Sequence, residues 1–296
     1  MEEIVEEQKE ELKVKKKFTI LNFSPWRILA YFIIYSFLGY IFETIFGMMT
    51  KGVVESRQSF LYGPFCCIYG VGAVFMTFIL QYFNKNQNTL FLAGLIAGSI
   101  VEYSVSFFSE KIFNVIWWDY SNMPLNINGR ICALYSIFWG FLAIYLVGYA
   151  NPTLDKFLNW INKRIPKKHA KVIIAIISIL LFIDWIVSSF ALNAFVVRKA
   201  YEYNLNTDER EKIVADYNRL YVDNPKLGEF INKHFSDYVV IRALPNLKTV
   251  DRDGNMIYYE NYVGDIKTYY YKFNIQIKDS LQNVINLNKG EALEEN

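Results

Sequence analysis

Three acidic residues lie inside long apolar segments of the sequence, namely Glu43, Glu102 and Asp184. A charged group inside a membrane helix costs about 2.5 to 3.5 kcal/mol on insertion scales, so it usually faces the protein interior and has a partner. Glu43 and Glu102 each lie close to the end of their segment, about 9 Å from it at 1.5 Å per residue. Both glutamates therefore lie at one level if the two segments cross a membrane in the same direction.

Cationic and polar side chains fall near the same predicted surface. Arg57 precedes the second apolar segment, Arg130 begins the fourth, and Asp119 and Asn126 lie in the loop before it. Two carboxylates held close together repel each other, and guanidinium groups between them remove this penalty. Two interpretations follow. One is a polar, partly hydrated pocket that binds a solute, an ion or a lipid headgroup, and the other is a structural salt-bridge network that ties the first four helices together.

Asp184 lies near the middle of the last apolar segment, beside Trp185 and one helical turn before Ser188. One interpretation is structural, with Asp184 buried as a neutral acid or bonded to a neighbouring helix. The other is a role in a proton relay.

The elements that must position these residues are five apolar runs. Hydrophobic residues make up 53% of the chain and aromatic residues 18%, more than an ordinary soluble domain carries. A bilayer core of about 30 Å requires about 20 apolar residues of helix. The runs that meet this length are Trp26–Met49, Phe60–Phe83, Thr89–Phe108, Arg130–Ala150 and Lys171–Val197. The sequence thus predicts an all-α integral membrane protein, with a bundle of about five transmembrane helices over residues 26–197.

Basic residues near the ends of these runs predict the orientation. They gather in the leading segment 1–25 and in the fourth connection, at Lys13, Lys15, Lys16, Lys17, Arg27, Lys156, Lys163, Arg164, Lys167, Lys168 and Lys171. The prediction is a multi-pass membrane protein with a cytoplasmic N-terminus and residues 198–296 outside. Within the fourth connection, Leu154 to Ile161 fit either a short helix on the inner membrane surface or a solvated linker.

Small residues at helical spacing predict how the spans pack, because small side chains let membrane helices approach closely. The third span carries Gly94, Gly98, Glu102 and Ser106 at intervals of four residues. Ser36, Gly39, Glu43 and Gly47 form a similar stripe on the first span, and Ala133, Ser136, Gly140 and Ala143 form one on the fourth. Both glutamates therefore belong to faces that turn toward other helices.

For the tail, residues 198–296, the sequence predicts a small α+β or helical domain that caps the bundle or contacts a partner. Helices are expected over Thr207–Tyr221, with Thr207 as the cap, and over Pro225–Phe235. Asp253-Gly254 between Leu247–Val250 and Met256–Tyr259 predicts a hairpin.

Several function classes are excluded or disfavoured. A net charge of +2 without a basic stripe argues against nucleic acid as a partner. Cys66, Cys67 and Cys132 lack the spacing of a zinc site, so no metal or cofactor is expected. The two histidines, His169 and His234, lie outside the spans, which argues against known intramembrane protease chemistry. An enzyme would have to use carboxylates and arginines alone.

The stretch Phe37–Gly140 resembles the bacterial Putative ABC-transporter type IV family, also called CmpB-like. The matching elements, in order, are Glu43; Arg57, Phe60, Leu61, Tyr62, Gly63, Pro64, Ile68, Tyr69 and Gly70; Glu102; Trp118, Asp119, Tyr120 and Ser121; and Asn126, Gly129, Arg130, Trp139 and Gly140. The chain departs from the family pattern at Gln58 and Ser59 and in the tail after Arg198. The resemblance implies a multi-span protein of the bacterial inner (plasma) membrane that is labelled as a permease.

The leading hypothesis is a permease-like membrane subunit that binds or translocates a small solute or ion through a pocket near one membrane face. Membrane lipids are expected partners, and a homo-oligomer is left open. The sequence has no G-x-x-x-x-G-K-[ST] loop, so energy would come from a separate ATPase subunit. The alternatives are a membrane-integral enzyme or lipid- or envelope-modifying factor that uses the same carboxylates, and a non-catalytic membrane scaffold or sensor.

Overall fold

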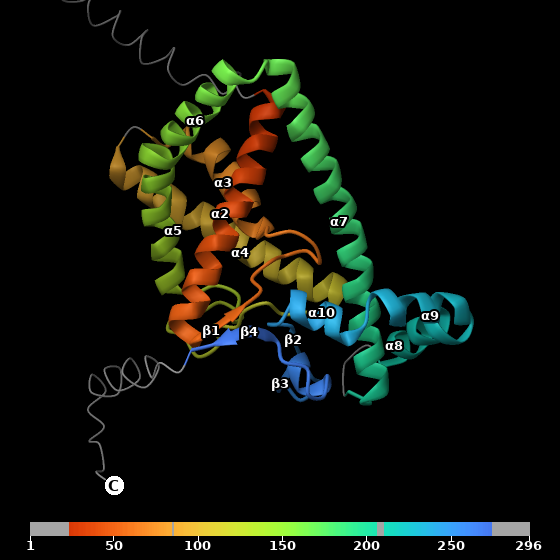
Figure 1. The fold of residues 1–296 in the computed structure, drawn as a ribbon. Coiled ribbons are helices and arrows are strands. Elements are labelled where there is room, and N and C mark those ends of the chain that lie inside the picture. Colours follow the sequence, from red (N-terminus) through yellow and green to blue (C-terminus); the bar gives the residue numbers. More distant parts are fainter. Residues whose placement is uncertain (1–23, 85, 206–209, 274–296) are drawn as a thin grey trace, which may run out of the picture. The chain divides into compact units, whose positions relative to one another are not determined.

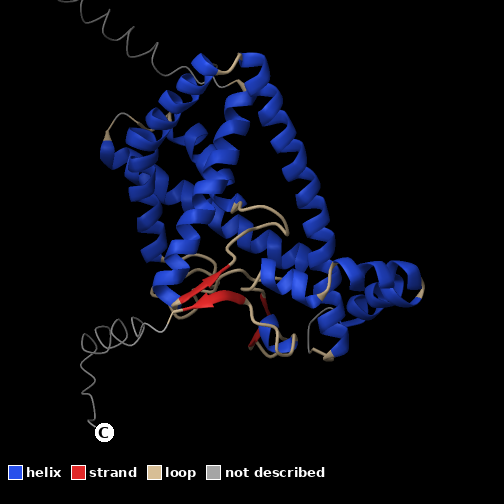
Figure 2. Cartoon of the chain, viewed as in Figure 1, coloured by secondary structure: helices blue, strands red, loops and turns tan. Residues whose placement is uncertain are grey.

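The computed structural model describes residues 24–84, 86–205 and 210–273, and it is mainly helical with a few short strands (Figures 1 and 2). Within these ranges, 4 helices are long and apolar enough to cross a membrane. They are α2 (Pro25–Lys51), α4 (Gln87–Phe113), the continuous helix Ala133–Arg164, and α7 (Lys167–Glu202). The predicted fold class, an all-α membrane protein, is confirmed. The basic residues predicted to face the cytoplasm at Lys13, Lys15, Lys16 and Lys17 lie outside the described residues.

The second predicted span is shorter than expected. Helix α3 covers Cys67–Leu80, which is 14 residues or about 21 Å, less than a hydrocarbon core. The backbone from Ser56 to Cys66 is irregular. Gly63 has a φ of +82°, outside the helical region, and Pro64 has no N–H to donate. The prediction of a helix from Phe60 is therefore wrong for its first part and holds only from Cys67.

The fourth span continues farther than predicted. Helix α5 (Ala133–Tyr145) passes through a π-helical turn, η2 (Leu146–Ala150), directly into α6 (Asn151–Arg164). The helix predicted around Leu154 is present, but it is continuous with this span and is not a separate element. The alternative of a solvated linker is wrong.

The chain divides into two compact units. The described part of unit 1 holds residues 24–35, Ile68–Val105 and Asp119–Leu181. Its apolar core combines side chains of α3, α4 and α5, including Met76, Leu90 and Ala143. Helices α4 and α5 approach so closely that a Cβ atom at Gly94 would overlap Ala143 and one at Gly98 would overlap Trp139. The small-residue stripe of the third span therefore serves as a packing face, as predicted.

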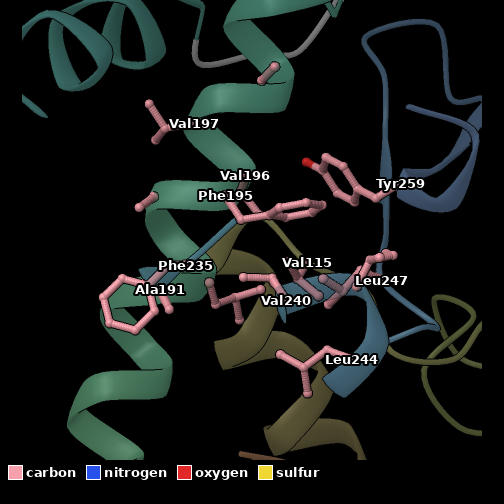
Figure 3. Packing of buried hydrophobic residues seen from close by; sticks show 14 of the residues in the cluster. Val115, Ala191, Phe195, Val196, Val197, Phe235, Val240, Leu244, Leu247 and Tyr259 are labelled. Atoms are coloured by element: carbon pink, nitrogen blue, oxygen red, sulfur yellow. The ribbon is translucent and has the colours of Figure 1, made fainter. Parts of the chain in front are cut away.

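The described part of unit 2 holds Ser36–Cys67, Ser106–Trp118 and residues 182–273. Its core joins the last turns of α7 to the tail, with Phe195 packed among Val115, Val240, Leu247 and Tyr259 (Figure 3). The tail elements are α8 (Arg210–Tyr217), η3 (Asn218–Val222), α9 (Pro225–His234), α10 (Asp237–Ala243) and η4 (Tyr259–Tyr262). The tail thus shares a core with the ends of membrane helices.

The strands also belong to unit 2. Strand β2 (Lys248–Val250) pairs antiparallel with β3 (Met256–Tyr258), which confirms the predicted hairpin. Strand β1 (Val53–Glu55) pairs with β4 (Tyr269–Lys272), a pairing that the sequence did not indicate. Helices α8 and α9 match the two predicted tail helices, but the predicted cap Thr207 lies outside the described residues.

Candidate functional site

Glu102 is the most enclosed of the predicted site residues in unit 1, with 5% of its surface exposed. The Tyr120 hydroxyl donates a hydrogen bond to Glu102 Oε1 at 2.9 Å, and Trp139 Nε1 donates one to Glu102 Oε2 at 3.0 Å. Neither donor carries a charge. Among the described residues, no ion pair to Glu102 is formed.

The local sequence explains how these two donors reach Glu102. Gly98, one turn earlier on α4, leaves room for the Trp139 side chain of α5. The Ser99 hydroxyl adds a 2.8 Å hydrogen bond to the Ser136 hydroxyl of α5. Tyr120 is held from the other side by stacking on Tyr135, with ring centroids 4.6 Å apart. Glu102 therefore lies where α4, α5 and the loop 119–132 meet.

This arrangement leaves the Glu102 carboxyl group with lone pairs that accept no hydrogen bond. Each carboxylate oxygen has two lone pairs, and each accepts one hydrogen bond here. A buried carboxylate without a compensating positive charge is costly. The group can therefore accept a proton or a cation, and either would remove the uncompensated negative charge.

Arg130 lies near the neighbouring residue on α4. Its guanidinium carbon is 5.7 Å from the ring centroid of Tyr103, and Asn128 Nδ2 donates a 3.0 Å hydrogen bond to the Tyr103 hydroxyl. Tyr103 follows Glu102 directly in the sequence, so Arg130 and Glu102 belong to the same end of α4. Sequence reasoning missed Tyr103, although its position beside Glu102 was visible.

Asp119 and Asn126 are engaged within their own loop. Asp119 Oδ1 accepts hydrogen bonds from the Ser121 N–H at 3.0 Å and the Ser121 hydroxyl at 2.6 Å. Asn126 Oδ1 accepts the Gly129 N–H at 3.1 Å, and Asn126 Nδ2 donates to the carbonyls of Ser121 and Met123. Both side chains shape the loop that presents Tyr120.

In unit 2, Arg57 has an ion-pair partner that sequence reasoning did not single out. Arg57 Nη2 lies 2.8 Å from Glu55 Oε1, and Lys51 Nζ lies 2.9 Å from the same oxygen. Glu55 is only 6% exposed. The signal in the sequence was the charge spacing of Lys51, Glu55 and Arg57 just after a predicted span.

Glu43 is half-buried on α2 in the same unit. Gly47 follows it by one helical turn on the same face, and a Cβ atom at Gly47 would be 2.6 Å from Arg57 Nη2. The Cys66 thiol is within electrostatic range of both Glu43 and Arg57. Unit 2 therefore brings Glu43, Glu55 and Arg57 into one neighbourhood.

Asp184 and Ser188 of α7 hold the irregular backbone that precedes α3. Asp184 Oδ1 accepts hydrogen bonds from the Ser188 hydroxyl at 2.9 Å and the Tyr62 N–H at 3.3 Å. Ser188 Oγ in turn accepts the Leu61 N–H at 2.7 Å. Irregular backbone at membrane depth requires such partners because no bulk water reaches it. These bonds fit the structural interpretation of Asp184.

In the part of the chain that the structure describes, no group of ≥ 3 His, Cys, Asp or Glu side chains is placed to hold a metal ion.

Comparison with known proteins gives one result. The family model described as Putative ABC-transporter type IV matches residues 30–189. No match is found among curated proteins or among solved structures. The matched region covers more than half of the chain and includes Glu43, Glu102 and Asp184. Together with the apolar helices, it indicates a membrane protein with a transporter-like role. The chain belongs to the Putative ABC-transporter type IV family.

Proposed function

We propose that this chain is the membrane-spanning subunit of a transporter and that the Glu102 carboxyl group binds a small cationic solute or ion. The observation that carries the proposal is the environment of Glu102. It is almost completely buried, and its two hydrogen-bond donors, Tyr120 and Trp139, are neutral. Family membership and the long apolar helices supply the context of a membrane transporter.

The physical reason is charge compensation. An ionised carboxylate in a low-dielectric interior is stabilised strongly by a cation, because the attraction between charges grows as the dielectric constant falls. Tyr120 and Trp139 hold the two oxygens in fixed positions. The carboxylate is thus oriented before the solute arrives, which lowers the entropic cost of binding.

Glu43 and Arg57 form the second part of the proposal. Within unit 2, Gly47 follows Glu43 on the same face of α2, and Arg57 carries a positive charge beside Gly47. A solute that carries both a positive and a negative group would find complementary charges at Glu43 and Arg57. Asp119, Asn126 and Arg130 would then act by holding the loop that carries Tyr120.

Energy is proposed to come from a separate ATPase subunit. The chain contains no phosphate-binding loop of the P-loop type, and the family is one of ABC transporters.

Reconstitution into proteoliposomes with a candidate ATPase subunit from the same organism tests the proposal. ATP-dependent uptake of labelled rubidium ions, cationic amino acids and polyamines is measured for the wild type, Glu102→Gln and Glu43→Gln. Glu229→Gln, at an exposed position on α9, is the matched control. We expect Glu102→Gln to abolish uptake of the transported cation and Glu229→Gln to retain it. Undiminished uptake with Glu102→Gln would overturn the proposal.

A non-catalytic scaffold is the second candidate, because Glu102 also ties α4, α5 and the loop 119–132 together. This function predicts that Glu102→Gln lowers the amount of folded protein and the uptake in equal proportion. The transport function predicts folded protein at wild-type abundance that fails to take up the cation. Abundance and uptake measured on the same samples separate the two.

A further inference from the structure

A cavity of about 600 Å³ in unit 1 is lined by residues of α2, α6 and the first half of α7. It does not include Glu102 or any other predicted site residue. Its size falls within the range of about 300 to 1,000 Å³ that is typical of small-molecule sites. The cavity is therefore large enough for a ligand beyond water.

The walls of the cavity are mainly apolar. Ile33 and Ile34 line it from α2, Ile174 and Ile177 line it from α7, and Leu158 is among the residues that line it from α6. Ser24 before α2 and Asp155, Asn159 and Asn162 of α6 add polar groups to the lining, whereas the isoleucines of α2 and α7 offer no hydrogen bonds to a small polar solute. A hydrocarbon chain, in contrast, fits them well.

Positive charges lie at one end of the same cavity. Arg27, Lys167 and Lys171 line it there. Arg27 is paired with Asp155, which also accepts a 2.7 Å hydrogen bond from the buried Tyr31 hydroxyl. Lys167 and Lys171 form no ion pair among the described residues. Two ammonium groups are thus uncompensated where the apolar walls begin.

The separation of charge and apolar surface follows from the sequence of α7. Lys167 and Lys171 belong to its first turns, and Ile174 and Ile177 follow within about 15 Å at 1.5 Å per residue. Lys171 Nζ also lies 5.8 Å from the Trp26 ring centroid, and tryptophan is enriched at headgroup level. The cavity is therefore polar where a membrane surface is expected and apolar farther in.

We propose that this cavity binds an anionic phospholipid. Its phosphate group would lie between Lys167 and Lys171, and one acyl chain would follow the isoleucines of α2 and α7. Free phosphate matches only the charged end, and a zwitterionic lipid matches only the apolar walls. An anionic phospholipid matches both, which is the basis of lipid recognition by basic pockets between membrane helices.

Lipid binding to the purified full-length chain in a neutral detergent tests this inference, independently of transport. Native mass spectrometry and the midpoint of thermal unfolding are followed with phosphatidylglycerol, phosphatidylcholine and inorganic phosphate. We expect phosphatidylglycerol to bind and to raise the midpoint, and the other two to have little effect. Equal effects of phosphatidylglycerol and phosphatidylcholine would overturn the proposal, and so would stabilisation by inorganic phosphate alone.

Charge variants locate the headgroup. The double variant Lys167→Gln/Lys171→Gln should weaken phosphatidylglycerol binding by roughly 30-fold, given the usual attraction per lysine near an anionic surface. Lys163→Gln/Lys168→Gln is the matched control, because all four lysines are exposed, the same charge is removed, and only Lys167 and Lys171 line the cavity. An equal loss of binding in both double variants would mean that phosphatidylglycerol is attracted by the basic surface in general, and it would overturn the proposed headgroup site.

Variants whose side chains fill the cavity test whether an acyl chain occupies it. Ile174→Trp adds bulk to the wall without changing a charge, and we expect it to abolish the stabilisation by phosphatidylglycerol. If Ile174→Trp does not yield folded protein, Ile177→Phe serves the same purpose with a smaller increase in volume. Binding that survives a folded, filled variant would contradict the proposed position of the lipid.

Discussion

The indole Nε1 of Trp139 donates a hydrogen bond to Glu102 Oε2 at 3.0 Å, from one membrane helix to the next. The contact exists because Gly98 lets α5 lie against α4 one turn before the carboxylate. This one contact packs α5 against α4 and also orients the buried Glu102 carboxyl group.

Replacement of Trp139 by phenylalanine keeps an aromatic ring and removes the donor to Glu102. The buried carboxylate then has one donor fewer, so the free energy of unfolding should fall by about 1 to 3 kcal/mol. We also expect ATP-dependent uptake to fall, because the carboxylate is no longer held in place. Trp185→Phe is the control, since Trp185 is 52% exposed on α7. Equal behaviour of the two variants would contradict the assigned role of Trp139.

Replacement of Gly98 by alanine should separate α4 from α5. An added Cβ atom would overlap the Trp139 side chain, and overpacking of this kind costs about 1 to 3 kcal/mol. Gly72→Ala is the matched control, because nothing lies within 4 Å of its added Cβ atom. Thermal unfolding in detergent measures both, and we expect only Gly98→Ala to lower the midpoint clearly.

Replacement of Arg57 by glutamine leaves the buried Glu55 carboxylate with Lys51 as its remaining ion-pair partner among the described residues. The Arg57 side chain is 17% exposed, so the expected loss is about 1 to 2 kcal/mol, below that of a fully buried pair. The double variant Glu55→Gln/Arg57→Gln should recover part of this loss because the buried charge is removed as well. A loss of unfolding free energy in the double variant that exceeds the sum of the losses in the two single variants would contradict this account.

Replacement of Ser188 by alanine removes the acceptor of the Leu61 N–H. An unsatisfied buried N–H costs about 1 to 3 kcal/mol, so the loop before α3 should open more readily. Ser178→Ala is the control on the same helix, since the Ser178 hydroxyl has no hydrogen-bond partner among the described residues. Phe60 in this loop is 5% exposed, so thiol labelling of a cysteine introduced at this position reports the opening, and we expect faster labelling only with Ser188→Ala.

The hairpin turn should respond to pH through Asp251. The N–H and side-chain amide of Asn255 donate to this carboxylate and hold its pKa below the ordinary value of 3.8. A lowered pKa in the folded state means that the contribution to stability is present above pH 3.8 and is lost as the pH falls through the folded-state value. Asp251→Asn should remove this acid-dependent part of the unfolding profile. Asp265→Asn, at an exposed position, should leave the profile unchanged.

Much of the fold follows from local properties of the sequence. Apolar runs of membrane length form helices because a helix satisfies its backbone hydrogen bonds within its own segment, where lipid offers no partners. Glycines spaced by four residues share one helical face, so the packing face at Gly94 and Gly98 could be predicted. The hairpin at Asp253-Gly254 could also be predicted, because a turn needs only two residues with suitable backbone preferences.

The exact partners of the charged residues required tertiary structure. The sequence predicts arginines as the partners that compensate the glutamates, whereas Glu102 accepts hydrogen bonds from Tyr120 and Trp139. Arg57 pairs with Glu55, and Asp184 binds the backbone of Tyr62, and neither of these pairings is predicted from the sequence. The common membrane level of Glu43 and Glu102 stays a prediction. Periodicity assigns a side chain to a face of its own helix and leaves open which residue approaches that face. Partner identity depends on contacts between distant segments, and only the folded chain decides those.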